Sequence, residues 1–333
     1  MTPLLDAIGL SRHFVVRRHP FARARATVRA VDGVDFRIGA GETLGLVGES
    51  GCGKSTVARL VVRLLPPTAG QLRFDGEDLL ALTGADLRRR RADIQMVFQD
   101  PAGALDPRHT AGAIVAEPME IHGIGPARVR RERAAELFAR VGLRSEQMGR
   151  FPHEFSGGQR QRIGIARALA LNPRLLICDE AVSALDVSVQ AQVVNLLKRL
   201  QRELGLAYLF IAHDLSVVRH ISDRVAVMYL GRIVETAPTD TLFATPFHPY
   251  TQSLLSAVPR HRPGAGRARI LLSGEVPNPL SPPDGCRFHP RCPLAIARCR
   301  TEVPQPVPLG HGHSAACHLV RPGEAAPSIR SAA

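Results

Sequence analysis

The stretch GESGCGKS, from Gly48 to Ser55, decides the fold of this protein. It fits the pattern G-x-x-x-x-G-K-[ST] and lies between a short apolar run and a helix-forming run, which is the context that a phosphate-binding loop requires. In such a loop, backbone N–H groups curl around phosphate oxygens, the lysine reaches the β- and γ-phosphates, and the hydroxyl binds Mg²⁺. The alternative is a glycine-rich turn without a ligand, which the complete pattern disfavours. The residues expected to bind ATP here are Gly48, Glu49, Ser50, Gly51, Cys52, Gly53, Lys54, Ser55 and Thr56.

Lysine is rare in this sequence and occurs only at Lys54 and Lys198. Arginine supplies most of the other positive charge. The use of lysine at position 54 indicates that the loop needs a flexible point charge and that the planar fork of arginine would not serve. We therefore expect Lys54 to act directly on the phosphates during catalysis.

Four polar residues follow apolar runs that are typical of buried strands. Asp179 and Glu180 end the run LLICDE; the first is expected to bind Mg²⁺ through water, and the second to orient or deprotonate the water that attacks the γ-phosphorus. Gln99 ends MVFQ and is expected to reach the metal and this water, while His213 follows LFIA and is expected to donate a hydrogen bond to the γ-phosphate. Taken singly, such an acidic pair is often a turn, such a glutamine a solvated loop residue and such a histidine structural. The prediction therefore depends on the loop at 48–55.

The order of apolar runs predicts an α/β fold. Residues 1–47 are expected to form strands, and ADIQMVFQD, RLLICDE and AYLFIAHD are expected to form more, with the helix SVQAQVVNLLKRLQREL between the last two. Strand–helix–strand spacing of this kind is typical of a parallel sheet with helices on its faces. From about 100 to 170 the pattern is mostly helical, which predicts a helical insertion in the α/β core.

The motif SGGQ at 156–159 lies shortly before LLICDE. With this motif, the loop at 48–55, FQD at 98–100, SALD at 183–186 and AHD at 212–214, the protein resembles the ATPases of ABC transporters over nearly its whole length. The resemblance implies a P-loop NTPase fold of the ABC cassette type, with a RecA-like core, an antiparallel β-subdomain and a helical signature subdomain.

In that family two cassettes pair head to tail, and each nucleotide lies between the phosphate loop of one and the signature motif of the other. The resemblance implies that Ser156, Gly157, Gly158 and Gln159 bind the ATP of the partner, through a helix N-terminus and backbone amides. The alternative for Ser156 is a structural helix N-cap, and the residue can serve both roles. Asp186 is expected at the dimer interface, where it would link the two sites.

The family also suggests that Phe14 stacks on adenine. A core phenylalanine is an equally good interpretation, because the insertion VVRRHPFARARAT at 15–27, whose role the sequence does not reveal, separates it from the next strand. Gln99 and the helical insertion at about 100–170 are expected to contact the coupling helix of a membrane subunit.

The tail narrows the resemblance to a subfamily. FHPYTQSLLSAVP at 247–259 and GCRFHPRCP at 285–293 resemble the C-terminal extension of dipeptide and oligopeptide importer ATPases, most closely the second of the two ATPase subunits. The implied partners are a sibling ATPase, with a homodimer as the alternative, two membrane permeases and an extracytoplasmic solute-binding protein. Related importers carry nickel, glutathione or short sugars, so the cargo stays open.

Four cysteines cluster near the end of the sequence with the spacing C-x₅-C-x₆-C-x₁₇-C: Cys286, Cys292, Cys299 and Cys317. Four thiolates can hold a [4Fe–4S] cluster or Zn²⁺, and the spacing does not distinguish them. Some transporters with this extension resemble iron–sulfur proteins here, which favours the cluster over zinc or four reduced thiols. The segment has few apolar residues, so we expect a metal to serve as its structural staple.

Length, net charge and hydropathy limit the location and the partners that we expect for this protein. The protein has 333 residues and a net charge of +13, and it contains no uncharged apolar run of the roughly 18 residues that a membrane span needs. We expect a peripheral protein on the cytoplasmic face of the cell membrane. Its domains are expected at 1–258, the cassette, and at 259–333, the small Cys-rich extension with a linker at its start and a disordered end.

No aromatic residues interleave the basic runs, so nucleic acid is not expected as a partner. The alternative classes of protein are a soluble cassette ATPase of DNA repair or translation and a P-loop kinase.

Overall fold

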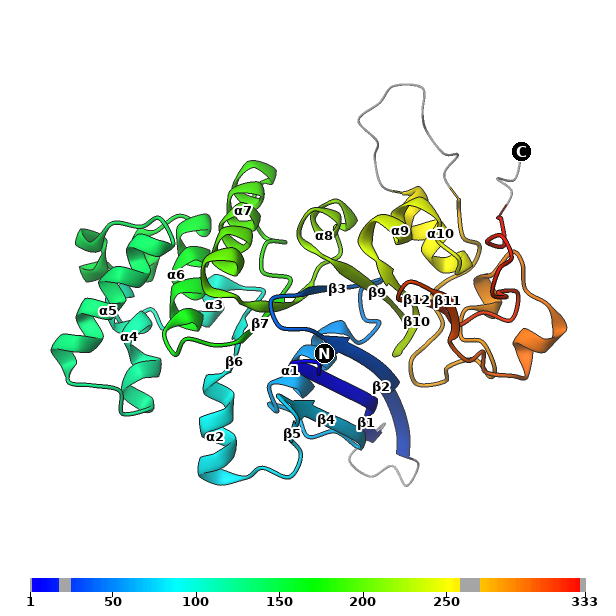
Figure 1. Ribbon diagram of the computed structural model, residues 1–333, viewed down its shortest axis with the longest axis horizontal. Helices are drawn as coiled ribbons and strands as arrows, with labels where there is room; N and C mark the ends of the chain where they lie inside the picture. Colours follow the sequence, from blue (N-terminus) through cyan, green and yellow to red (C-terminus); the bar gives the residue numbers. More distant parts are fainter. Residues whose placement is uncertain (1, 18–24, 258–269, 330–333) are drawn as a thin grey trace.

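The computed structural model describes residues 2–17, 25–257 and 270–329 (Figure 1). Two sheets organise it. A four-stranded antiparallel sheet has the order β2-β1-β4-β5, and an eight-stranded sheet has the order β11-β12-β10-β9-β3-β8-β7-β6. The strands of the first sheet are β1 (Leu5–Arg17), β2 (Arg25–Ile38), β4 (Ala69–Phe74) and β5 (Glu77–Asp78).

The larger sheet carries the predicted parallel core. Its strands are β3 (Thr43–Val47), β6 (Ile94–Val97), β7 (Leu175–Asp179), β8 (Ala207–Ile211), β9 (Arg224–Tyr229), β10 (Arg232–Pro238), β11 (Val307–Gly310) and β12 (His313–Ala315). The pairs β6–β7, β7–β8, β8–β3 and β3–β9 are parallel. Strands β3, β7 and β8 are buried along their whole length, as expected for parallel strands covered on both faces.

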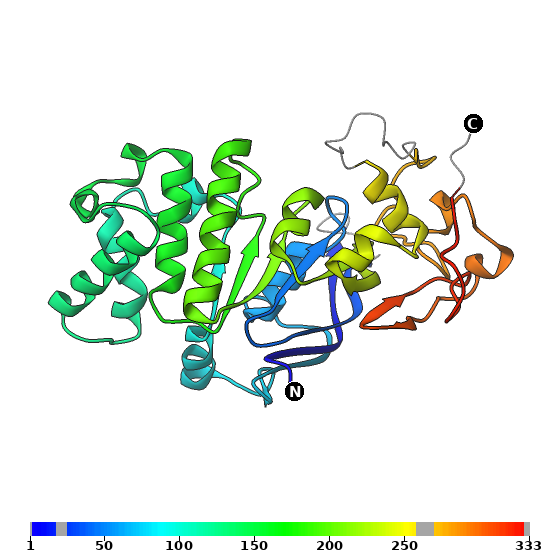
Figure 2. The ribbon, with the colours of Figure 1, turned by 45° about the horizontal axis from the view of Figure 1, so that its top comes forward.

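Successive residues of these strands enter two different cores. On β7, Leu175 and Ile177 pack with α1 (Lys54–Val61) and the antiparallel sheet, whereas Leu176 and Cys178 pack with the opposite face. Figures 1 and 2 show α7 and α8 on this opposite face. The helices that follow the signature motif or lie C-terminal to it are α6 (Gly157–Leu169), α7 (Val187–Leu204), α8 (Leu215–Ile221), α9 (Thr239–Ala244) and α10 (Pro249–Ser256).

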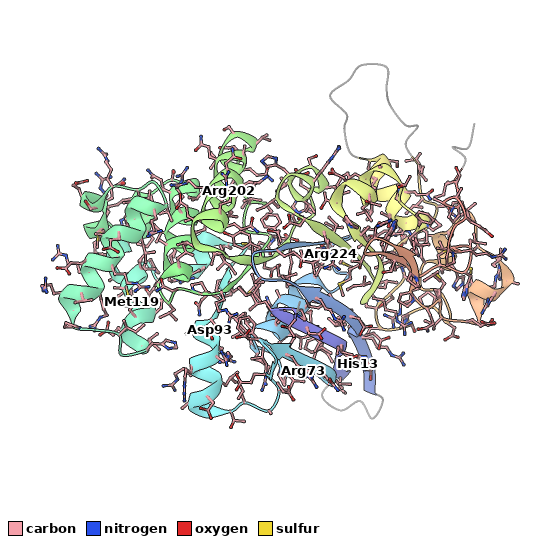
Figure 3. The ribbon with its side chains drawn as sticks, in the orientation of Figure 1. His13, Arg73, Asp93, Met119, Arg202 and Arg224 are labelled. Carbon is pink, nitrogen blue, oxygen red and sulfur yellow. The ribbon has the colours of Figure 1, made fainter. Side chains whose placement is uncertain are left out.

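The two sheets are joined near the start of β9. Arg224 donates to Glu42 Oε1 at 2.9 Å and to the carbonyl oxygen of Arg37, at the end of β2, at 3.2 Å. Figure 3 shows Arg224 between the two sheets. This ion pair holds the antiparallel sheet beside the strand that precedes the phosphate loop.

The region from 100 to 170 is helical, as the sequence pattern predicts. It contains α3 (Pro101–Ala104), α4 (Ala111–Ile121), α5 (Ala127–Arg140), the 3₁₀ turns Ser145–Gly149 and Pro152–Glu154, and the start of α6. Met119 of α4 is fully buried in this helical subdomain (Figure 3). The short helix α2 (Gly84–Ala92) lies apart from it and precedes β6.

The segment after the predicted linker is not a separate unit. Strand β12 pairs with β10, and β11 pairs with β12, so residues 307–315 extend the core sheet. Glu235 of β10 is fully buried; it pairs with His313 Nε2 at 2.8 Å and accepts the N–H groups of Phe247 and His248. Docking on the cassette thus supplies the stabilisation for which we predicted a metal staple.

Two further expectations meet the structure at segment ends. The two ends of the insertion at 15–27 continue β1 and β2 as an antiparallel pair, in which Val15 pairs with Thr27 and Arg17 with Arg25. The middle of the insertion lies outside the described residues. Near the C-terminus, where disorder is expected, Gln252 Nε2 donates to the Pro327 carbonyl oxygen and Gln252 Oε1 accepts the N–H of Ile329. The predicted linker at 259–269 also lies outside the described residues. Within the described ranges, no helix is long and apolar enough to cross a membrane.

Candidate nucleotide-binding site

The loop between β3 and α1 has the shape of a phosphate cradle. Gly48 has a φ of 154° and Gly53 a φ of 111°, and a Cβ at either position would collide with a backbone carbonyl oxygen, of Met228 and Ala30 respectively. Lys54 is buried, and its ammonium donates to the carbonyl oxygens of Gly48 at 2.8 Å and Glu49 at 3.0 Å. The lysine therefore lies at the centre of the loop, where it can exchange these carbonyls for phosphate oxygens.

Ser55 and Asp179 form the candidate magnesium site. The Ser55 hydroxyl donates to Asp179 Oδ1 at 2.9 Å, and Asp179 is only 4% exposed. Hydroxyl and carboxylate oxygens are the ligands that Mg²⁺ prefers, so the pair fits this ion. Burial raises the pKa of Asp179, and the neighbouring Glu180 charge adds to this, although the Ser55 hydrogen bond acts in the opposite direction. A bound cation would offset the cost of this buried charge.

The raised pKa gives a test of Asp179. Between the ordinary carboxyl pKa and the raised one, the folded protein holds a proton that the unfolded protein has lost, so stability falls as pH rises through this window and stays lower above it. Asp179→Asn should therefore raise the melting temperature of the nucleotide-free protein at pH 7, and should weaken Mg²⁺-dependent ATP binding. Differential scanning fluorimetry without Mg²⁺, with the exposed variant Asp86→Asn as control, measures the first effect. An unchanged or lowered melting temperature would contradict the assignment.

Glu180 meets two of the other predicted residues. Gln99 Nε2 donates to Glu180 Oε2 at 2.7 Å, and His213 Nδ1 lies 3.9 Å from the same oxygen. Glu180 has a φ of 48°, an uncommon conformation for a side chain of this size that is held by a hydrogen bond from its N–H to the Ile211 carbonyl. The parallel strands thus bring three separate sequence signals to one carboxylate.

Phe14 is not a core residue. It lies on β1, is partly exposed, belongs to neither main apolar cluster, and has the Arg12 guanidinium 4.7 Å from its ring centre. The ring therefore lies outside the main apolar clusters, and its stacking on adenine stays a prediction.

The signature motif begins α6. Ser156 Oγ accepts the N–H of Gln159 at 3.4 Å, and Gln159 Oε1 accepts the N–H of Ser156 at 3.0 Å, which is a reciprocal capping box. A Cβ on Gly158 would meet the Val189 side chain of α7, so this glycine allows close helix packing. Within the described part of the protein, no hydrogen bond or ion pair joins residues 156–159 to the phosphate loop. Asp186 is exposed at the N-terminus of α7, beside the 83% exposed Val187.

Comparison with known proteins identifies the family. A family described as "ABC transporter" matches residues 31–183, and one described as "Oligopeptide/dipeptide transporter, C-terminal region" matches residues 234–299. The "Probable peptide ABC transporter ATP-binding protein y4tS" of Sinorhizobium fredii is 55% identical, over 97% of this protein and 92% of that one. The "Oligopeptide transport ATP-binding protein AppF" of Bacillus subtilis is 54% identical, over 95% and 97%.

This protein is an ABC transporter ATP-binding protein. Among solved structures, the ATP-binding cassette MJ0796, in a dimeric post-hydrolysis state bound to ADP and Pi, matches this ABC ATPase with a TM-score of 0.63. The two share 29% identity, over 71% of this protein and 98% of that one. CbiO1 of Clostridium perfringens also matches with a TM-score of 0.63, at 26% identity over 73% of this protein and 92% of that one. The predicted P-loop ABC cassette fold is confirmed.

The structure does not support the predicted metal at the four cysteines. No group of three or more His, Cys, Asp or Glu residues in the described ranges, which include all four cysteines, is arranged to hold a metal ion. Cys286 and Cys292 pack against the main apolar core. Burial, with a smaller contribution from the neighbouring thiols, raises the pKa of Cys292 to about 12 and that of Cys317 to about 11. Cys286, Cys292 and Cys317 are therefore packed as small apolar side chains.

Two residues that sequence reasoning missed contact the phosphate loop. The hydroxyl of Tyr250 accepts the N–H of Glu49 at 2.9 Å, and Arg291 binds the Glu49 carboxylate. Glu49 is thus oriented by its own protein and not free to turn its side chain toward a ligand. Tyr250 belongs to the stretch FHPY and Arg291 to the stretch FHPR, which lie in the two segments that resemble the importer extension.

Proposed function

We propose that this ABC ATPase is one of two ATPase subunits of a peptide importer and works at the cytoplasmic face of the cell membrane. The observation that carries the proposal is the match of residues 234–299 to the C-terminal region of oligopeptide and dipeptide transporters. Relatives named for peptide and oligopeptide transport are similar to this protein over almost its full length, which supports the same conclusion.

Each residue of the site then has a role in ATP hydrolysis. Lys54 binds the β- and γ-phosphate oxygens. Ser55 and Asp179 would hold Mg²⁺, which would supply positive charge to offset the charge that develops on the phosphates. Glu180 orients the attacking water and accepts its proton. His213, 3.9 Å from Glu180, donates to the γ-phosphate. Gln99 positions Glu180 from the side, through its 2.7 Å hydrogen bond.

The second half of the reaction chamber comes from a partner cassette. In one copy, the N-terminus of α6 is exposed and capped by Ser156, and among the described residues it has no hydrogen bond to the phosphate loop of the same copy. Backbone N–H groups at a helix N-terminus bind anions, so this end suits the γ-phosphate of a nucleotide held by a second cassette. A sibling ATPase is the proposed partner, and ATP would join the two subunits until hydrolysis separates them.

A hollow connects the nucleotide site to the surface proposed for the permease. It has a volume of about 670 Å³, and its lining includes Ser55 and Asp179 of the magnesium site, Gln99, Pro118 of α4 and Arg167 of α6. A membrane subunit that contacts the helical subdomain here would sense the magnesium site through Gln99. Two permeases and an external solute-binding protein complete the proposed importer.

Reconstitution tests the function. The protein, expressed together with a pair of permeases and a sibling ATPase, should co-purify with them. Proteoliposomes that contain the complex should accumulate labelled dipeptides or oligopeptides when ATP and the solute-binding protein are supplied. Uptake of nickel, glutathione or a short sugar in place of peptides would assign one of the related importers. Failure to associate with any permease would overturn the transport function and favour a soluble ATPase of DNA repair or translation.

A further inference from the structure

The C-terminal extension, residues 270–329, reaches the phosphate loop through one arginine. Arg291 Nη1 donates to Glu49 Oε2 at 2.8 Å and Arg291 Nη2 donates to Glu49 Oε1 at 3.2 Å. This is a two-bond fork, and the arginine side chain is only 10% exposed. Paired charge-assisted bonds of this geometry fix orientation as well as adding binding energy. The extension therefore holds the second residue of the phosphate loop.

Holding Glu49 also holds the catalytic lysine. The Glu49 carbonyl accepts a hydrogen bond from Lys54 Nζ at 3.0 Å and one from the Cys52 N–H at 3.3 Å, and its N–H donates to Tyr250. The carboxylate, the N–H and the carbonyl of one residue thus bind different neighbours. A loop whose second residue is fixed in this way has little freedom to move when phosphate oxygens replace the carbonyls around Lys54.

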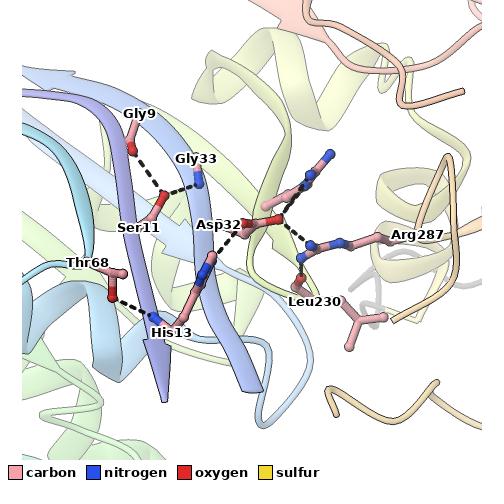
Figure 4. Close-up of polar contacts among 9 residues, drawn as sticks. Gly9, Ser11, His13, Asp32, Gly33, Thr68, Leu230 and Arg287 are labelled. Carbon is pink, nitrogen blue, oxygen red and sulfur yellow. Dashed lines mark hydrogen bonds and ion pairs between the residues drawn. The ribbon is translucent and has the colours of Figure 1, made fainter. Parts of the chain in front are cut away.

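A second arginine of the extension, Arg287, contacts β2 and the turn after β9, which also adjoin the phosphate loop. Arg287 forms an ion pair with Asp32 of β2 and donates to the carbonyl oxygen of Leu230 (Figure 4). The Asp32 carboxylate also accepts a hydrogen bond from Nε2 of His13 at 2.8 Å. His13 lies on β1 and directly precedes Phe14 in the sequence. Figure 4 shows Asp32 between these two partners, which come from the antiparallel sheet and from the extension.

The turn held by Arg287 is bonded to the phosphate loop as well. Gly231, which follows Leu230, donates its N–H to the Cys52 carbonyl at 2.8 Å and accepts the N–H of Asp32 at 2.9 Å. Between the two arginines, Phe288 is buried, with its ring centre 5.3 Å from that of Tyr229 and 5.4 Å from that of Tyr250. Packing of this ring fixes the segment that carries both guanidinium groups.

We infer that Arg287 and Arg291, the arginine clamp, are positioning residues of the nucleotide site. They fix the phosphate loop and the adjoining strand β2 from the C-terminal extension, so the extension is part of the ATP-binding apparatus. Neither arginine needs to touch ATP; Arg291 acts through Glu49, and Arg287 acts through Asp32 and the turn at Leu230. The inference goes beyond the proposed import function, because it needs only an ATPase that binds ATP.

The test measures nucleotide affinity on the full-length protein. Arg291→Ala should raise the Kd for Mg²⁺–AMP-PNP about tenfold in isothermal titration calorimetry, with the binding stoichiometry per folded molecule unchanged. Glu49→Gln, which keeps the shape and the backbone contacts of Glu49, should raise it by three- to tenfold. The double variant should be no weaker than Arg291→Ala alone, because both changes remove the same contact. Arg291→Lys keeps the charge without the fork and should fall between the wild type and Arg291→Ala.

Arg298→Ala is the matched control, since Arg298 lies in the same extension and pairs with the exposed Glu302. Its Kd should equal that of the wild type. A merely structural role for the clamp would lower the melting temperature and the stoichiometry while leaving the Kd of the folded fraction unchanged, and that result would overturn the inference. If Arg291→Ala does not fold, Glu49→Gln decides alone, and a Kd within twofold of the wild-type value would overturn it. These measurements use no permease, so failure of the import proposal would leave them unaffected.

Discussion

Replacing Glu180 by glutamine should lower the ATPase turnover number by about 10²-fold or more. The change keeps the volume of the side chain and removes the basic oxygen that would accept the proton of the attacking water. ATP binding should survive, because the phosphate contacts are expected from Lys54 and the loop amides, and Lys54 bonds the Gly48 and Glu49 carbonyls and not the Glu180 carboxylate. Single-turnover phosphate release and equilibrium nucleotide binding, measured on the same preparation, separate the two effects.

The local structure indicates that Glu180→Gln will leave the surrounding hydrogen bonds and the backbone unchanged. Gln99 Nε2 donates to Glu180 Oε2, and a glutamine at 180 can offer its amide oxygen to the same donor. The left-handed backbone at position 180 is held by backbone hydrogen bonds, which the substitution does not touch. Glu203→Gln, on the exposed end of α7, is a control for loss of one negative charge. Near-normal hydrolysis by Glu180→Gln would show that another group handles the water.

The sequence pattern alone predicts that the candidate catalytic residues lie together, for a physical reason. Asp179, Glu180 and His213 follow strands of a parallel sheet, and the carboxyl ends of such strands meet at one edge. Apolar runs predict the strands, whereas the hydrogen bond of Gln99 to Glu180 is seen only in the structure, because the pattern predicts Gln99 near the metal and the attacking water. The helices of the helical subdomain could be predicted in the same way, because the apolar periodicity of a helix does not depend on residues far away in the sequence.

The structure of the C-terminal extension could not be predicted from the sequence pattern. Strands β11 and β12 span four and three residues, too short for an alternating pattern, and they form only because β10 offers an edge. The contact of Arg291 with Glu49 joins residues 242 positions apart in the sequence. Cysteine spacing was a poor guide here, because four thiols near one another in sequence can be packed as apolar groups as readily as they can be arranged around a metal.

Replacing Ser156 by arginine should abolish turnover of the assembled ATPase while leaving ATP binding to the isolated subunit largely intact. The first backbone N–H groups of α6 attract anions, and a long cationic residue at its cap would occupy the space proposed for the partner's γ-phosphate. ATP binding to one copy depends on the loop at 48–55, to which residues 156–159 have no hydrogen bond or ion pair in the described part of the protein. Equilibrium binding on the single subunit and steady-state hydrolysis on the dimer measure the two quantities.

A capping defect is the competing explanation for such a loss, because Ser156 also caps α6 and its removal costs about 1 kcal/mol of stability. Ser156→Asp separates the two, since aspartate is as good an N-cap as serine but repels a phosphate. If the motif binds the partner's nucleotide, Ser156→Asp should be inactive with a normal melting temperature, whereas the neutral cap Ser156→Asn should retain more turnover. Activity in the aspartate variant would mean that position 156 serves the helix alone, and reduced ATP binding by the isolated arginine variant would place the signature motif in the site of its own subunit.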